Sequence, residues 1–352
     1  MGKYLLIDGN NLAIRCAFAN DDLTNQAGIP TGVHYGFFNS LMQLKKQFSD
    51  YQFLIAWDGK SKRRMEESED AVKKGIISSV YKDNRKKGDE TPLPILKFFE
   101  QSDFLKKGIG QLGIPQIRLS DFEADDILAS YARKLSKENN KVVIVTSDRD
   151  YWQLLDENTS LCMSGKQVTK DSWEQEHGIK CDKVVDMGAF CGDAGDNIFG
   201  IPGWGEKTAI KELKKYGSME EILKAYHKKY DPLRKKYPDI VDEDEFLILK
   251  DAKNDPKKPN SKFKFPEINI NLPFTGVCKA FHEGEIKVVK TELMALVFEE
   301  RLHLSFSLKK MDDCIKDLPE IESQDFNRDR VIEFMEFFDI YTLHDQIDVF
   351  NK

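Results

Sequence analysis

Three short apolar runs in this sequence each lead into an aspartate. The runs and the residues that end them are 5–7 with Asp8, 53–57 with Asp58, and 142–147 with Asp148. Nearly continuous apolar runs of this length are typical of strands that are buried on both faces, as in a parallel sheet. Because ligands of such sheets bind outside the carboxyl ends of the strands, the pattern predicts acidic side chains gathered at a binding edge.

Helical patterns separate these runs. Apolar residues recur at helical spacing in residues 33–48 and 122–135, and a short apolar segment, 114–119, precedes the second pattern. Strands that alternate with helices at this rhythm predict an α/β fold, with a mostly parallel sheet flanked by helices. A further helix is expected near the end of the sequence, at residues 330–338, with packing as its role.

The composition is that of a folded chain. Of the 352 residues, 40% are hydrophobic and 32% are charged. No apolar stretch reaches the roughly 20 residues that a membrane-spanning helix needs. The six cysteines are scattered without a C-x-x-C pair, which is typical of reduced thiols. We therefore expect a cytoplasmic protein without a membrane partner.

Positive charge is concentrated in two segments, although the net charge is −7. Residues 60–107 contain 13 Lys or Arg against 9 Asp or Glu, and residues 203–236 contain 10 against 5. The first segment includes residues 60–90, which fit no sheet element. An insertion of this length in a compact domain is usually functional or disordered. A polyanionic partner is therefore compatible with the sequence at these two segments.

Nine acidic residues are expected at the strand ends and in nearby turns. They are Asp8, Asp58, Glu123, Asp125, Asp126, Asp148, Asp150, Asp193 and Asp196. Two carboxylates about 4 Å apart repel by about 1 kcal/mol in water and by about 4 kcal/mol at an effective dielectric constant near 20. A converged set therefore requires raised pKa values or bound cations. All-oxygen ligands favour Mg²⁺ or Mn²⁺, and two such ions suit phosphodiester hydrolysis.

Each acid taken alone has a simpler interpretation. An aspartate after a strand is often a turn or helix-cap residue, and Asp148 would cap a helix that begins beside it. Glu123, Asp125 and Asp126 would favour the dipole of the helix that they begin. Because so many acids share one predicted edge, we favour a metal site over a set of independent caps.

A glycine-rich stretch, residues 192–209, includes Gly203 and Gly205 just before a predicted helix. Backbone N–H groups at a helix N-terminus bind phosphate without reading bases. Four lysines follow along this helix: Lys207, Lys211, Lys214 and Lys215. The alternative is a tight turn between helices with a solvated lysine face. Since the spacing matches neither a P-loop nor a dinucleotide fingerprint, we favour non-specific binding to a duplex backbone.

Short motifs in a fixed order carry a resemblance to a known family. They are Leu6-Ile7-Asp8-Gly9-Asn10-Asn11, Trp57-Asp58-Gly59-Lys60, Tyr81-Lys82-Asp83-Asn84-Arg85, Glu123-Ala124-Asp125-Asp126, Ser147-Asp148-Arg149-Asp150 and the stretch 192–209. The chain resembles the structure-specific 5′-nucleases: bacteriophage 5′-exonucleases, the 5′-nuclease domain of bacterial DNA polymerase I and, more distantly, flap endonucleases. The resemblance covers about residues 1–230. Because no polymerase module follows, we expect a stand-alone, phage-type enzyme.

The resemblance implies a PIN-like nuclease domain at residues 1–190, with a helical arch at about 60–90 through or under which a 5′ single strand passes. It implies a helix-three-turn-helix DNA-binding element at about 191–230, within a C-terminal region 191–352 that is otherwise helical. Some relatives bind K⁺ at this element through backbone carbonyls, which here correspond to those near residues 200–205. Residues 254–289 have no clear counterpart and receive no role.

The resemblance also implies roles for single residues. The nine acids would hold two Mg²⁺ ions, for which Mn²⁺ would substitute, with Asp58 and Asp148 central to catalysis. Lys82 and Arg85 would stabilise charge at the scissile phosphate, and Tyr81 would stack on a terminal base. The other residues expected to contact DNA are Arg15, Arg63, Arg64, Gly203, Gly205, Lys207, Lys211, Lys214 and Lys215.

The expected function is a Mg²⁺-dependent 5′-3′ exonuclease and flap endonuclease that removes primers and 5′ flaps during replication. The expected partners are DNA with a 5′ flap, overhang or nick, RNA–DNA hybrids, and replication proteins, with the chain acting as a monomer in a bacterial or phage-infected cell. One alternative is a DNA-junction binding protein with weak catalysis, which the complete acid set disfavours. Another is a PIN-type ribonuclease, which the basic stretch and the arch disfavour.

Overall fold

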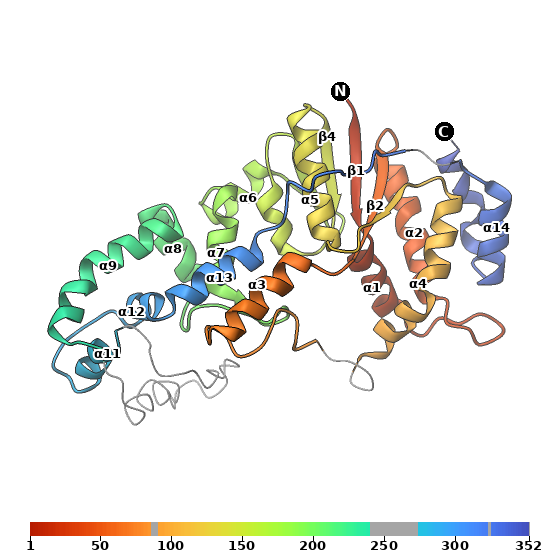
Figure 1. Ribbon diagram of the computed structural model, residues 1–352. Helices are drawn as coiled ribbons and strands as arrows, with labels where there is room; N and C mark the ends of the chain where they lie inside the picture. Colours follow the sequence, from red (N-terminus) through yellow and green to blue (C-terminus); the bar gives the residue numbers. More distant parts are fainter. Residues whose placement is uncertain (86–90, 240–273, 323–324, 352) are drawn as a thin grey trace. The chain divides into compact units, whose positions relative to one another are not determined.

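The computed structural model describes residues 1–85, 91–239, 274–322 and 325–351 (Figure 1). The chain forms two compact units, each built from segments that are far apart in the sequence. Unit 1 comprises Met1–Lys62, Lys86–Trp173 and Met311–Lys352, and unit 2 comprises Arg63–Arg85 and Glu174–Lys310. The division into domains at residue 190 stays a prediction.

Unit 1 contains a six-stranded sheet, which confirms the mostly parallel α/β prediction. Its strands are β1 (Lys3–Asp8), β2 (Gln52–Trp57), β3 (Gln116–Arg118), β4 (Lys141–Val145), β5 (Thr159–Met163) and β6 (Lys166–Val168). The spatial order is β3-β2-β1-β4-β5-β6, and β6 alone runs antiparallel to its neighbour. Since β1 pairs with β2 on one side and β4 on the other, the three acid-ended strands are adjacent.

Helices cover both faces of this sheet (Figure 1). They are α1 (Gly9–Ala19), α2 (Gly32–Gln47), α4 (Leu93–Gln111), α5 (Ala124–Lys137), α14 (Arg328–Phe337) and the 3₁₀ helix η4 (Tyr341–Phe350). One core joins alternate strand residues, such as Leu5 and Ile7, to α1, α2, α4, α14 and η4. On the other face α5 contacts β1, β2 and β4. The packing role expected for the C-terminal helix is therefore the one observed for α14.

Unit 2 is mainly helical. It contains most of α3 (Lys62–Lys73) and the second half of α6 (Lys170–His177). It also contains α7 (Val184–Cys191), α8 (Glu206–Tyr216), α9 (Met219–Lys236), α11 (Thr275–His282), α12 (Lys290–Val297) and α13 (Glu299–Lys309). A small antiparallel pair, β7 (Gly192–Asp193) and β8 (Ile198–Phe199), lies between α7 and α8 in the chain. The expected arch begins as α3 and continues as turns to residue 85, and residues 86–90 lie outside the description. Most of segment 254–289 lies outside it as well.

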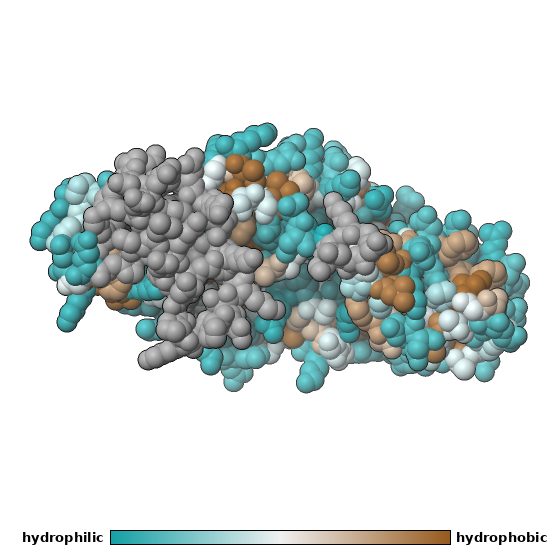
Figure 2. Space-filling view, turned by 90° about the horizontal axis from the view of Figure 1, so that it is seen from below, coloured by the Kyte–Doolittle hydropathy of each residue, from teal (hydrophilic) through white to brown (hydrophobic). Residues whose placement is uncertain are grey.

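The described surface shows no membrane-spanning element. In residues 1–85, 91–239, 274–322 and 325–351, no helix is both long and apolar enough to cross a bilayer. Outside the grey atoms, the face in Figure 2 is mainly hydrophilic, and its apolar side chains form small separate patches.

His34 is a polar side chain inside the core of unit 1. It lies on α2, is fully buried, and packs its ring against Phe338 at 3.8 Å and Phe334 at 5.5 Å between centroids. Within the described residues, neither ring nitrogen has a hydrogen-bond partner. Burial lowers the pKa of His34 to about 3, because the charged ring would lose its hydration without gaining a partner.

We expect His34→Leu to reduce the loss of stability that acid causes. The unfolded chain protonates His34 below about pH 6.5, whereas the folded chain does so near pH 3, so stability present above pH 6.5 is lost as the pH falls. Between about pH 6 and pH 4, the wild type should lose about 1.4 kcal/mol per pH unit more than the variant. Urea unfolding across this range measures the difference, and parallel curves would contradict a neutral buried His34.

Candidate active site at the carboxyl edge of the sheet

Asp8 and Asp148 each lie at the carboxyl end of a strand and cap the helix that follows. Asp8 ends β1, and its Oδ1 accepts a hydrogen bond from the backbone N–H of Asn11 in α1 at 2.9 Å. Asp148 follows β4, and its Oδ1 accepts from the N–H of Asp150 at 2.8 Å, at the start of the 3₁₀ helix η2 (Arg149–Leu154). The capping interpretation of these residues is therefore correct, and in each carboxylate the cap uses Oδ1.

Asp58 caps a helix that is distant in the sequence. It follows β2, and its Oδ1 accepts from the N–H of Ala124 at 2.9 Å, at the start of α5. The chain comes this close because Gly59 donates its N–H to the carbonyl of Phe122 at 2.8 Å. A side chain at Gly59 would place its Cβ 2.0 Å from the carbonyl oxygen of Leu119, so the glycine is required for the approach.

Two asparagines that follow Asp8 hold the neighbouring loops on either side. Oδ1 of Asn10 accepts from the backbone N–H of Asp58 at 3.1 Å. Oδ1 of Asn11 accepts from the N–H of Ser147 at 3.0 Å and from its hydroxyl at 2.9 Å. The loops after β2 and β4 are thereby fixed to the first turn of α1, which carries them beside Asp8.

The carboxylates at this edge repel one another. Asp8 is buried, and burial together with the charges of Asp58 and Asp148 raises its pKa well above the ordinary value for an aspartate. Tyr151 opposes this rise, because its hydroxyl donates to Oδ2 of Asp8 at 3.1 Å. Burial, followed by the charges of Asp8, Asp125 and Asp148, raises the pKa of Tyr151 as well. The structure thus brings Asp8, Asp58, Asp125 and Asp148 within electrostatic reach of one another.

The other predicted acids of unit 1 differ in their surroundings. Glu123 is buried at the N-cap position of α5, and Oδ1 of Asp125 accepts from the N–H of Asp126 at 2.7 Å. Asp126 is 1% exposed, and its Oδ1 accepts from the N–H of Asp312 at 2.8 Å, so it also holds the C-terminal segment. Asp150 is half-buried in η2. Across the described residues, no three His, Cys, Asp or Glu side chains stand in metal-binding geometry, and ligation stays a prediction.

Asp193 and Asp196 belong to unit 2, in and after the β7 strand. Oδ1 of Asp193 accepts from the N–H groups of Gly195 and Asp196 at 2.8 and 3.3 Å, which shapes the turn between β7 and β8. Oδ2 of Asp193 pairs with the buried ammonium of Lys309 at 2.9 Å. Both aspartates are therefore engaged by groups of unit 2 itself, and their joining with the acids of unit 1 stays a prediction.

The predicted arch cations contact Asp196. Arg85 pairs with its Oδ1 at 2.6 Å, Lys82 lies 3.7 Å from its Oδ2, and the Tyr81 hydroxyl donates to Oδ2 at 3.1 Å. Burial raises the pKa of Asp196, but Lys82 and Arg85 outweigh it and lower the pKa overall. Tyr81 is buried, with Lys82 4.8 Å and Arg64 5.8 Å from its ring centre. Stacking of Tyr81 on a base therefore requires this segment to rearrange.

Two arginines predicted to contact DNA hold a helix end. Arg63 donates to the carbonyls of Ser307 at 2.8 Å and Lys310 at 2.6 Å, and Arg64 donates to the carbonyl of Leu308 at 3.0 Å. These carbonyls lie at the C-terminus of α13, where intrahelical donors are lacking and a positive charge is favoured. Arg64 is 1% exposed, so we correct its assignment to DNA contact: it is an internal helix cap.

The glycine-rich turn has an exposed and a buried part. Gly203 has a φ of 85°, a conformation that favours glycine, and a Cβ at Gly205 would meet nothing within 4 Å. Trp204 between them is buried, stacks on Phe190 at 4.2 Å and donates its ring N–H to the carbonyl of Thr291 at 2.9 Å. The tryptophan anchors the turn while both glycines stay exposed ahead of α8.

The remaining predicted DNA contacts are exposed cations. Arg15 is exposed on α1 in unit 1. The lysines exposed on α8 in unit 2 are Lys207, Lys211, Lys214 and Lys215. Their spacing of three or four residues places them along one side of the helix.

Sequence reasoning missed the residues that position this site. Asn10, Asn11 and Tyr151 act on Asp8 and on the loops that carry Asp58 and Asp148, and Lys309 pairs with Asp193. The two asparagines lie inside a motif already singled out, so their place directly after Asp8 was an available signal. Nothing in the local sequence marks Tyr151 or Lys309, because each acts through a contact more than 100 residues away in the chain.

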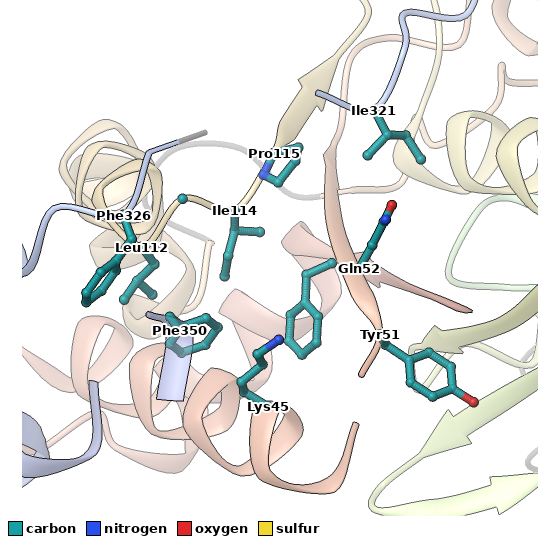
Figure 3. Close-up of a pocket in the computed structure, with 11 residues that line it drawn as sticks. Lys45, Tyr51, Gln52, Leu112, Ile114, Pro115, Ile321, Phe326 and Phe350 are labelled. Atoms are coloured by element: carbon teal, nitrogen blue, oxygen red, sulfur yellow. The ribbon is translucent and has the colours of Figure 1, made fainter. Parts of the chain in front are cut away.

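A cavity of about 330 Å³ in unit 1 lies at the opposite end of the strands (Figure 3). Gln52 and Phe53, which begin β2, line it together with Lys45, Pro115 and Phe350. Since the carboxylates follow the other end of β2, this cavity is separate from the candidate active site.

The sheet and its acidic edge are typical of a nuclease, and family profiles agree with this class of protein. The profile described as 5'-3' exonuclease, N-terminal resolvase-like domain, matches residues 3–180, and that described as 5'-3' exonuclease, C-terminal SAM fold, matches residues 179–246. The chain belongs to the 5′-3′ exonuclease family, as its motifs predicted. The SAM-type fold includes the predicted helix-three-turn-helix element.

Individual relatives agree with this assignment. The 5'-3' exonuclease of Aquifex aeolicus is 32% identical over 277 residues, which are 76% of this chain and 89% of that protein. A thermostable DNA polymerase I of Thermus thermophilus is 34% identical over 224 residues, which are 63% of this chain but 25% of the polymerase. The chain thus spans about a quarter of its polymerase relatives.

A solved structure has the same fold. The crystal structure of bacteriophage T5 D15 flap endonuclease, a pseudo-enzyme-product complex with DNA and metal ions, superposes with a TM-score of 0.58. The match covers 99% of this chain and 100% of that chain, at 16% identity. At this identity the similarity is one of fold.

We expect Asp58→Asn to stabilise the metal-free protein. Asparagine keeps an oxygen that accepts from Ala124, whereas loss of the charge removes the repulsion on Asp8. The free energy of unfolding in EDTA should rise by about 1 kcal/mol. Asp58→Ala, which also loses the cap, should fall about 1 kcal/mol below Asp58→Asn. Chemical unfolding measures both, with Asp121→Asn, an exposed acid of the adjoining loop, as the neutral control. If Asp58→Asn were less stable than the wild type, this would contradict repulsion between the carboxylates of Asp58 and Asp8.

Proposed function

We propose that the chain is a Mg²⁺-dependent 5′-3′ exonuclease and flap endonuclease that cleaves DNA at 5′ flaps, overhangs and nicks, and removes primers, including RNA paired with DNA, during replication. The observation that carries the proposal is the convergence of Asp8, Asp58 and Asp148 at the carboxyl edge of the sheet, in a member of the 5′-3′ exonuclease family. Replication proteins are its proposed partners and the cytoplasm is its proposed location.

The acidic residues of the site fit divalent cations. The donors are carboxylate oxygens, which Mg²⁺ and Mn²⁺ prefer, and the pKa of Asp8 is raised by burial and, after it, by the neighbouring charges of Asp58 and Asp148. The residues proposed to hold two ions are Asp8, Asp58, Glu123, Asp125, Asp126, Asp148, Asp150, Asp193 and Asp196. Bound there, the ions supply a lowered pKa for the attacking water and charge stabilisation at the scissile phosphate.

Side chains of the protein prepare this site. The Asn11 N–H and the Tyr151 hydroxyl each occupy one oxygen of Asp8, which fixes the direction of its remaining lone pairs. Asp58 and Asp148 are fixed in the same way by the helices that they cap. Such preorganisation matters because groups that are already oriented do not have to reorganise during the reaction.

Lys82 and Arg85 are the proposed charge partners of the scissile phosphate. Both now pair with Asp196, and phosphate oxygens are acceptors of the same chemistry as this carboxylate. When a phosphate takes over these cations, Asp196 becomes available for its proposed role as a ligand. The exchange substitutes one anion for another and keeps the cations paired.

The glycine-rich turn and α8 are the proposed duplex-binding surface. The exposed glycines leave room for a phosphate ahead of the helix N-terminus, and the lysines of α8 continue the positive surface. Coordination of K⁺ by carbonyls near residues 200–205 belongs to the same proposal. Neither feature reads bases, which fits an enzyme that recognises the shape of its substrate.

Cleavage of a 5′-labelled flap duplex in Mg²⁺ tests the proposed function. We expect cuts at or near the junction, no cutting in EDTA, and a loss on the order of 10²–10³-fold in Asp148→Ala with flap binding retained. Asp121→Ala, which also removes one exposed acid near the edge, is the matched control and should cleave normally. Tight flap binding by the wild type without cutting, in Mg²⁺ or Mn²⁺, would instead support the junction-binding alternative.

The lysines of α8 are tested by the salt dependence of binding. Replacement of Lys211 and Lys215 together by alanine should reduce the slope of log K against log salt by about two, because each phosphate contact releases about one counterion. Replacement of Lys134 and Lys137, exposed in the last turn of α5, is the matched control and should leave the slope unchanged. Binding titrations on an uncleaved flap duplex in Ca²⁺ measure the slope, and equal slopes for both double variants would place the α8 lysines outside the interface.

A further inference from the structure

Helix α13 lies outside both family profiles, which end at residue 246, yet it contacts the segments of unit 2 that carry the proposed phosphate partners. Segment 63–85 holds Lys82 and Arg85, and the β7–β8 turn holds Asp193 and Asp196. Helix α13 is joined to segment 63–85 and to the β7–β8 turn. The contacts are made by its own side chains and by side chains that donate to its carbonyls.

The first end of α3 is fixed to the last turn of α13. Arg63 and Arg64 donate to three carbonyls at residues 307, 308 and 310. The hydroxyl of Ser307 also donates to Glu67 of α3 at 2.7 Å. These bonds pair the start of one helix with the end of the other.

The far end of α3 is fixed to the first turn of α13 by one residue. Arg301 donates its Nε–H to the carbonyl of Ile76 at 2.6 Å, just after α3 ends. The two helices therefore run antiparallel, with 12 and 11 residues respectively. At 1.5 Å per residue the two helices have similar lengths, so hydrogen bonds at both ends fix the whole of α3 along α13.

Arg301 is an unusual residue in this position. It is 7% exposed, and within the described residues its Nη2 has no hydrogen-bond partner. Its guanidinium lies 5.0 Å from the ring centre of Phe298 and 5.9 Å from that of Phe199, which offsets part of the cost of burial. Burial lowers the pKa of Arg301 to about 10. A buried guanidinium that serves one carbonyl is costly for packing alone, which points to a role in holding Ile76.

Helix α13 also holds the β7–β8 turn, through side chains one and two turns beyond Arg301. The hydroxyl of Ser305 donates to the carbonyl of Phe199 at 2.6 Å, and Lys309 pairs with Asp193 at 2.9 Å. The same helix thus sets the position of the proposed metal ligands in unit 2 and the position of the segment whose cations contact Asp196.

We propose that Arg301 is a positioning residue for the nuclease reaction: it fixes the end of α3 to α13 and so places Lys82 and Arg85 against the β7–β8 turn. The proposal rests on the proposed function for its kinetic consequence. Its structural consequence, the order of segment 63–85, does not depend on any activity.

Hydrogen exchange on the full chain in EDTA, without DNA, tests the structural consequence. Arg301→Gln should speed amide exchange in residues 74–82 by about tenfold or more, the fold-change that a hydrogen bond to a charged group represents. Exchange in α8 and α9 should stay unchanged. Lys310→Gln removes the same charge from an exposed side chain just past α13 and should behave as the wild type.

Kinetics on the flap duplex test the second consequence. In Arg301→Gln we expect kcat to fall by about 10²-fold, the scale of loss that follows from about 1 Å of misplacement. KM should change little, because the exposed lysines of α8 are unaltered. Arg301→Lys, which keeps a cationic donor of different reach, should recover part of kcat.

Several outcomes would overturn the proposal. Exchange in residues 74–82 equal to that of the wild type would do so whatever the activity, and so would faster exchange throughout unit 2, which would make Arg301 a general packing residue. If Arg301→Gln does not fold, Arg63→Gln releases the other end of α3 and should speed exchange at residues 63–70. A wild type that fails to cleave flaps would remove the proposed function and leave exchange to decide the role of Arg301.

Discussion

Repulsion among carboxylates is the constraint that the acidic edge of the sheet has to satisfy. Because β1 pairs with β2 and β4, the residues that follow these three strands meet at one edge, where burial and then the charges of Asp58 and Asp148 raise the pKa of Asp8. The fold meets this repulsion by directing the N-termini of α1, α5 and η2 at the same edge. Each N-terminus carries a partial positive charge and donates a backbone N–H to one carboxylate. The acids are thereby oriented before any cation binds.

In this arrangement, capping a helix and binding a metal ion are compatible roles for the same carboxylate. A helix cap uses one lone pair of a carboxylate and holds the side chain in one direction, which leaves its second oxygen for another partner. The caps therefore explain how the edge folds with its negative charge unbalanced, and they are compatible with the proposed binding of cations. Asp126 is the contrasting case, because it is almost fully buried and holds the backbone of Asp312. Among the nine predicted ligands, it is the one that also holds the C-terminal segment.

Local patterns predicted the sheet, helices α2, α5, α8 and α14, and the acidic edge, since strand burial and helical spacing are encoded over a few residues. Local patterns do not predict contacts between segments that are distant in the sequence. Arg63 and Arg64 sit in a charged helix that reads as solvent-exposed, yet they cap carbonyls more than 240 residues away. Tyr81 likewise reads as an available aromatic residue, although its ring is buried between cations. The sequence identified which residues carry charge, and tertiary packing decided which of those charges face solvent.

The two units treat their acids in different ways. In unit 1 the acids are held by helix N-termini, which cannot move without unfolding a helix. In unit 2 Asp193 and Asp196 are balanced by the cations Lys309, Lys82 and Arg85, which are side chains and can change partners. Of these, Lys309 is buried on α13, whereas Arg85 is exposed at the end of the described arch segment. The ion pair most able to exchange partners is therefore that of Arg85 with Oδ1 of Asp196, while Lys82 and the Tyr81 hydroxyl stay at Oδ2.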